Sequence, residues 1–153
     1  MGFWYFFFGK RPQIEDGFFG TMLFMEDSKD PAKSYFECQR YFRPSGENIG
    51  LSVTGPLSGP TQRQKDFFNQ VETNYPLLVD KLMPIIEERF GAWMPLPVIK
   101  AFAREFKLGY FLIPTREEQP MAWEITFDTV HDLNHIVTVG MLDYEPQYVR
   151  IDG

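Results

Sequence analysis

Both histidines of this 153-residue chain lie in one short polar segment, residues 128–135. His131 and His135 stand four residues apart, and Asp128 and Asp132 lie beside them. Two imidazoles at positions i and i+4 of a helix can share a metal ion, and an imidazole next to a carboxylate can act as a general acid or base. These residue types raise one hypothesis of function, a metal-dependent or acid/base enzyme built on His131 and His135.

The surroundings of the two histidines favour a turn instead. The segment falls between two stretches with strand patterns, and it contains Asp and Asn, which form turns. No Glu follows His131 in the manner of zinc proteases. Calcium binding through Asp128, Asp132 and Asn134 would lack both the spacing and the glycine of an EF-hand loop. We therefore predict a hairpin loop over residues 128–135 that binds no metal or cofactor.

No other catalytic constellation can be assembled from the sequence. The serines lie outside Gly-x-Ser-x-Gly settings, and the glycine-rich loop 55–60 lacks the Lys-Ser/Thr pair of a phosphate-binding loop. Cys38, the only cysteine, cannot form an internal disulfide, and it shares the apolar side of an expected strand with Phe36 and Phe42. We therefore expect a buried thiol, a reducing, cytoplasmic location and no catalytic residues.

The net charge of −6 is concentrated in the last third of the chain. Residues 108–153 contain two basic and eight acidic residues, whereas the two signs nearly balance elsewhere. Nucleic acid is an unsuitable partner, because phosphate contacts need clustered Lys and Arg, but a basic protein partner would fit. The simpler interpretation is that these acids keep the strands soluble. The acids that we expect at a partner surface are Glu117, Glu118, Glu124, Asp128, Asp132, Asp143 and Glu145.

The longest helical pattern runs from Thr61 to Phe90 and is expected to organise the fold. Its apolar residues recur in steps of three and four, which places them on one side of a helix. They are Phe67, Phe68, Val71, Tyr75, Leu78, Leu82, Ile86 and Phe90. Thr61 with Gln64 three residues later predicts a capping box at the helix start. Pro76 predicts a break, because proline removes a backbone donor and clashes with the preceding turn.

Strand patterns lie on both sides of that helix. They cover residues 18–25, 34–43, 48–54, 108–113, 121–127, 135–142 and 148–151, and a shorter helical pattern covers 98–106. Residues 13–17 are expected to form a turn. At 153 residues, 44% of them hydrophobic, the chain suffices for one domain with a core. We predict a single α+β domain over residues 1–153, with an antiparallel sheet flanked by a long helix broken near Pro76 and one shorter helix.

An aromatic run, residues 3–8, opens the chain. It is shorter than the roughly 20 apolar residues of a transmembrane helix, and its basic residues follow it, unlike those of a secretory signal. We predict a strand that is buried on both faces. The alternative is an exposed aromatic patch for a membrane surface or a partner, including a second copy in a homo-oligomer.

A resemblance rests on residues of the C-terminal half and of the long helix. They are Trp123-Glu124-Ile125-x-Phe127-Asp128, His131-Asp132, His135, Thr138-Val139 and Val149-x-Ile151-Asp152, with the helix opening Thr61-x-x-Gln64 and Phe68. Over residues 18–153 the chain resembles a group of small uncharacterised bacterial α+β domains, known as domains of unknown function. Some relatives of that group are thought to be immunity proteins of polymorphic toxin systems. The resemblance implies a toxin as partner and transfers no catalytic residues.

These observations support one leading hypothesis of function and two alternatives. The leading hypothesis is a non-enzymatic cytoplasmic binding protein, an immunity protein that neutralises a basic toxin through its acidic surface. The first alternative is the enzyme built on His131 and His135. The second is a homo-oligomeric structural protein held together by the aromatic N-terminal strand.

Overall fold

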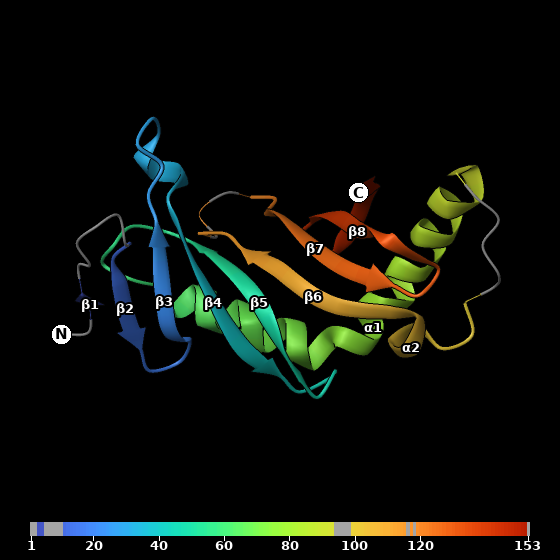
Figure 1. The fold of residues 1–153 in the computed structure, drawn as a ribbon, viewed down its shortest axis with the longest axis horizontal. Coiled ribbons are helices and arrows are strands. Elements are labelled where there is room, and N and C mark those ends of the chain that lie inside the picture. Colours follow the sequence, from blue (N-terminus) through green and yellow to red (C-terminus); the bar gives the residue numbers. More distant parts are fainter. Residues whose placement is uncertain (1–2, 5–10, 94–98, 116, 118, 153) are drawn as a thin grey trace.

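The computed structural model describes residues 3–4, 11–93, 99–115, 117 and 119–152 (Figure 1). In chain order, its elements are β1 (Phe3–Trp4), β2 (Gln13–Asp16), β3 (Gly20–Met25), the 3-10 helix η1 (Pro31–Lys33), β4 (Tyr35–Phe42), β5 (Glu47–Thr54), α1 (Gln62–Trp93), α2 (Phe102–Glu105), β6 (Phe106–Ile113), β7 (Ala122–Thr129), β8 (Asp132–Leu142) and β9 (Glu145–Asp152). Most of the aromatic run, and with it the prediction of a strand buried on both faces, lies outside the described residues.

The described strands form one nine-stranded sheet, in the same order as in the sequence. Neighbouring strands are antiparallel except β5 and β6, which run parallel with Gly50 opposite Tyr110 and Val53 opposite Ile113. A parallel pair needs a crossover connection, which contains α1 and α2 here. Two antiparallel meanders are thus joined through a helix. This confirms the predicted α+β fold with a largely antiparallel sheet, one long helix and one short helix.

The start of α1 has the predicted capping box. The backbone N–H of Thr61 donates to Oε1 of Gln64 at 3.0 Å, and the backbone N–H of Gln64 donates to Oγ1 of Thr61 at 3.3 Å. The side-chain nitrogen of Gln64 also donates to the carbonyls of Thr54 and Pro114, at 2.6 and 3.1 Å. These carbonyls belong to the last residue of β5 and the first residue after β6. One buried side chain therefore joins the helix start to both parallel strands.

Helix α1 continues through both of its prolines. It is one helix of 32 residues that contains Pro76 and Pro84. The helix is therefore not interrupted near Pro76, where the sequence predicts a break. An internal proline removes one backbone hydrogen bond and bends the axis, while the turns on either side can stay helical. Figure 1 shows that the axis of α1 changes direction along its length.

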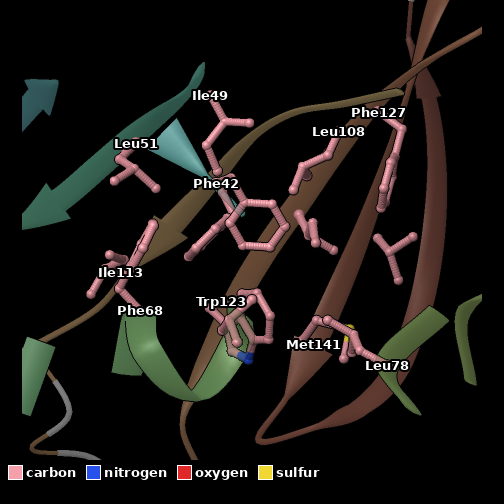
Figure 2. Close-up of a cluster of buried hydrophobic side chains, with 14 of the residues drawn as sticks. Phe42, Ile49, Leu51, Phe68, Leu78, Leu108, Ile113, Trp123, Phe127 and Met141 are labelled. Atoms are coloured by element: carbon pink, nitrogen blue, oxygen red, sulfur yellow. The ribbon is translucent and has the colours of Figure 1, made fainter. Parts of the chain in front are cut away.

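The core lies between α1 and one face of the sheet. The apolar stripe that the sequence predicts on α1 is buried, apart from a half-buried Tyr75. Strand residues such as Phe42, Trp123 and Phe127 gather opposite it (Figure 2). The Phe68 ring of α1 lies 6.0 Å from that of Phe42, measured between ring centroids. Helix α1 packs on this face. Among the described residues, no α-helix packs on the opposite face of the sheet, which we call the uncovered face (Figure 1).

The predicted turn at residues 13–17 contains a strand. Gln13–Asp16 is β2, which pairs with β3, and the turn begins after Asp16. The carboxylate of Asp16 accepts hydrogen bonds from the backbone N–H groups of Phe18 and Phe19, both at 2.9 Å. Pairing with β3 thus outweighs the local turn pattern, because a strand is stabilised mainly by its neighbours.

The predicted helix over residues 98–106 is much shorter in the structure. Within the described residues 99–106, only Phe102–Glu105 is helical, as α2, because Phe106 already pairs with Thr129 in the sheet. Ile99, Phe102 and Phe106 are all buried, as the helical pattern requires, but a bend between helix and strand achieves the same burial. The spacing of three and four residues therefore predicted which residues are buried, but it did not predict whether their backbone is helical or extended.

Candidate functional site

His131 lies in the two-residue turn between β7 and β8. Its Nε2 is 2.8 Å from Oε1 of Glu105, the last residue of α2. The other oxygen of Glu105 accepts the backbone N–H groups of Ala101 and Lys100, at 2.7 and 2.9 Å. The bonds from Ala101 and His131 hold the pKa of the Glu105 carboxyl below its usual value. This network fastens the hairpin to α2, and the predicted chain reversal is confirmed, although the turn is only Val130–His131.

His135 has a carboxylate partner of its own. Its Nδ1 lies 2.6 Å from Oδ2 of Asp132 in β8, and this contact lowers the pKa of Asp132. The two imidazoles are therefore held by different carboxylates on different elements. In the parts of the chain that the structure describes, no three His, Cys, Asp or Glu side chains are grouped so that they could hold a metal ion. The His131–Glu105 and His135–Asp132 contacts are suited to stabilising the β7–β8 hairpin.

Two of the acids predicted for a partner surface lie on the uncovered face of the sheet. Glu124 and Asp128 alternate along β7 with the buried Trp123, Ile125 and Phe127, so they point away from α1. Asp128 is exposed, and Glu124 is partly shielded by its neighbours. These two carboxylates are the part of the predicted acidic surface that the fold brings onto one face.

The other predicted acids are distributed over the rest of the molecule. Glu145 forms a 2.5 Å ion pair with Lys81 of α1, on the helix side. Asp143 lies in the turn between β8 and β9 with a φ of 51°, and its Oδ1 accepts the N–H of Met121 at 3.0 Å. Asp132 is the partner of His135, Glu117 is exposed between β6 and β7, and Glu118 lies outside the described residues.

Glu124 belongs to a polar cluster on the uncovered face of the sheet. The hydroxyl of Tyr148 donates to Oε2 of Glu124 at 2.7 Å, and Nη1 of Arg150 donates to the same oxygen at 3.2 Å. The bond to Glu124 raises the pKa of the Tyr148 phenol. The ring of Tyr148 lies across Gly140, where an added Cβ would be 2.0 Å from its Cε2 atom. The absence of a side chain at Gly140 therefore allows this cluster to form.

A groove with a volume of about 1030 Å³ hollows the same face beside this cluster. It extends over β3, β4, β5 and β6, and half of the residues that line it carry a side-chain hydroxyl or amide group. They include Thr21, Gln39, Asn48, Ser52, Thr54 and Tyr110. The floor is open at Gly50, which has no side chain and pairs with Gln39 on one side and Tyr110 on the other. The groove and the cluster around Glu124 together form the candidate functional site.

Cys38 is a core residue, as the sequence predicts. Its side chain belongs to the buried apolar cluster, and burial raises the pKa of the thiol to about 12. A thiol that is this hard to ionise is a poor nucleophile near neutral pH.

Sequence reasoning did not identify the groove or the partners of Glu124. The alternation along residues 148–151 places Tyr148 and Arg150 on the same side of a strand, which was a usable signal. Their meeting with Glu124 also requires the register of β7, β8 and β9, in which Gly140 lies opposite both Glu124 and Tyr148. The groove requires β5 and β6 to be neighbours, although α1 separates them in the sequence.

Comparison of the chain with protein-family models, with curated proteins and with solved structures found no match. The resemblance to bacterial domains of unknown function therefore stays a prediction. Among the helices of the described residues, none is both long and apolar enough to cross a membrane.

Proposed function

We propose that this protein is a non-enzymatic, cytoplasmic binding protein that holds one protein partner against the uncovered face of its sheet. A basic toxin domain is the partner that fits both the acidic last third of the chain and the sequence resemblance. In that case the protein is an immunity protein, which neutralises the toxin by covering its active site.

The uncovered, hollowed face of the sheet is the observation that carries this proposal. It combines a groove of about 1030 Å³ with the cluster of Glu124, Tyr148 and Arg150. Tyr and Arg are enriched where proteins bind one another, because they combine large contact areas with hydrogen bonding. Tyr148 is also one of the more exposed large side chains, at 47% of its full exposure.

The contacts of the two histidines give less support to the alternative of an enzyme. His131 and His135 are each engaged by a separate carboxylate. A metal assay on the untagged protein tests this alternative directly. The homo-oligomer alternative depends on the aromatic N-terminal strand, and a mass measurement in solution tests it.

Co-expression tests the proposed function. The candidate toxin is the product of the reading frame beside the gene for this chain, expressed in a bacterial host with and without the chain. We expect the wild-type chain to restore growth and the Asp128→Lys variant to restore it poorly, because a reversed charge on the uncovered face repels a basic partner.

The matched control is Glu88→Lys, which makes the same change of charge at an exposed position of α1. It should protect as well as the wild type does. A wild-type chain that forms no complex with this toxin and gives no protection would refute the proposed function. Equal losses in Asp128→Lys and Glu88→Lys would refute the assignment to the uncovered face.

A further inference from the structure

The groove on the uncovered face carries two charged side chains without a counter-ion. Glu37 of β4 and Lys33, which precedes β4, both line it, and both are exposed. Neither forms an ion pair or a hydrogen bond through its side chain with another described residue. Charges left unpaired in a concave site are available to a ligand, and the lower effective dielectric of such a site strengthens their interactions.

Two carboxylates, those of Glu37 and Glu124, act on Tyr110 in the groove. Tyr110 forms the wall on β6, and Ser52 is buried in the floor beside it. Burial raises the pKa of the Tyr110 phenol, and the negative charges of Glu124 and Glu37 raise it further. A cation is therefore favoured between Glu37 and Tyr110, whereas Lys33 disfavours one at its own end.

The shape and lining of the groove suit a polypeptide loop. Sites for small organic ligands are mostly apolar and enclose most of the ligand surface. This groove is broad, open and lined by neutral groups that can both donate and accept hydrogen bonds, such as Gln39 and Asn48. Backbone amides of a loop need such groups, and the open floor at Gly50 provides the depth.

We propose that a protruding loop of the protein partner enters this groove, and that a basic side chain of the loop binds Glu37 beside the rings of Tyr35 and Tyr110. The inference rests on the proposed function and assigns the residues that recognise the partner. Arginine fits best, because its planar guanidinium pairs with a carboxylate and stacks on aromatic rings. The side chain enters from the Tyr110 end, where Lys33 does not repel it.

A pair of matched peptides tests this inference without the partner. Acetyl-Gly-Gly-Arg-Gly-Gly-amide and the same peptide with Glu in place of Arg are titrated into isotope-labelled protein, and backbone amide shifts are followed by NMR. We expect the Arg peptide to shift Gly50, Ser52 and Tyr110 and the Glu peptide to leave them unchanged. Glu37→Gln should weaken binding of the Arg peptide about tenfold, as expected for the loss of one charge-assisted contact.

Further variants extend the same titration. Lys33→Gln should strengthen binding of the Arg peptide, because it removes a repelling charge. Gly50→Val should abolish binding, because its methyl groups would fill the floor, while an added Cβ comes no closer than 3.4 Å to its nearest neighbour. The amide spectrum of each variant shows whether it is folded, and Gly50→Ala is the milder substitution if Val is not tolerated.

Three outcomes would overturn the inference. They are no shifts at these amides with the Arg peptide, equal responses to both peptides, and a response to an uncharged disaccharide but to neither peptide.

Binding to the candidate toxin separates this inference from the proposed function. If Glu37→Lys and Gly50→Val bind the toxin as the wild type does while Asp128→Lys does not, the groove assignment is wrong and the proposed function stands. If the wild type does not bind the toxin, the proposed function is wrong, and the peptide titration still decides whether the groove selects a basic side chain.

Discussion

Gln64 is the residue on which the junction between helix and sheet depends most directly. Its side chain accepts one hydrogen bond from Thr61 and donates two, to Thr54 and Pro114, and it is 1% exposed. All the hydrogen-bonding capacity of the amide group except one lone pair is used. A buried polar residue of this kind stabilises the fold when its own polar groups are paired, as they are here.

We expect Gln64→Ala to lower the free energy of unfolding by about 2 kcal/mol, because it leaves the carbonyls of two half-buried residues, Thr54 and Pro114, without this donor. Urea denaturation measures this change. Gln62→Ala is the control, since Gln62 lies at the start of the same helix and its side chain bonds to Asp66 at the exposed surface. A similar loss in both variants would contradict the role assigned to Gln64.

Glu105 makes folding stability depend on pH in the acid range. Its pKa in the folded protein is below the ordinary value of 4.5, owing to the Ala101 N–H and His131. A carboxyl whose pKa is depressed by folding stabilises the protein above its unfolded pKa, and this contribution is lost as pH falls through the folded pKa. Protonation therefore weakens the link between α2 and the β7–β8 hairpin.

We expect Glu105→Gln to be less stable than the wild type at neutral pH and to converge with it below the folded pKa of Glu105. The measurement is the urea midpoint as a function of pH. Glu87→Gln is the control at an exposed site of α1. A wild-type stability that falls no more steeply in acid than that of Glu105→Gln would show that this pair contributes nothing.

In the hairpin of β8 and β9, the position of one aromatic ring depends on one glycine. Gly140 leaves room for the Tyr148 ring, which bonds to Glu124 one strand further away. We expect Gly140→Ala to displace the ring, break this bond and bring the pKa of Tyr148 back toward 10.0. An NMR titration of the tyrosine ring measures the change.

Gly17→Ala is the control for that substitution, because a Cβ at Gly17 would meet no atom within 4 Å. It should leave the titration of Tyr148 unaltered. A Gly140→Ala protein in which Tyr148 titrates as in the wild type would mean that the ring does not depend on the glycine for its position.

The elements themselves could be predicted where the signal is local. The capping box of Thr61 and Gln64 and the apolar stripe of α1 are both set by residues within a few turns, and both are found as expected. The course of the chain at Phe106 could not be predicted in this way, because helical and extended backbones bury the same residue there. The strand pairing with Thr129 decides between them.

The candidate site could be predicted only in part, for the same reason at a larger scale. Alternation along β7 placed one face of that strand in the core and Glu124 and Asp128 on the other. The groove needs β4, β5 and β6 side by side, and the crossover through α1 brings the last of these into place. No local pattern reports such an arrangement, because it depends on contacts between residues far apart in sequence.

In the molecule as a whole, the two faces of the sheet have different roles. One face packs against α1 and forms the core, and the opposite face combines a groove with charged and aromatic side chains. An acidic protein with such a face should attract a basic partner more strongly at low ionic strength, because salt screens exposed charges.

The most direct test of this account is the equilibrium dissociation constant between the chain and its candidate toxin, measured by calorimetry for two doubly substituted chains. Glu37→Lys with Asp128→Lys changes the uncovered face, and Glu87→Lys with Glu88→Lys makes the same change of charge on α1. We predict that the first pair weakens binding at least about 100-fold, roughly 2.7 kcal/mol, and that the second leaves it within about threefold of the wild type. Binding that the second pair weakens as much as the first, or that neither pair alters, would contradict the account.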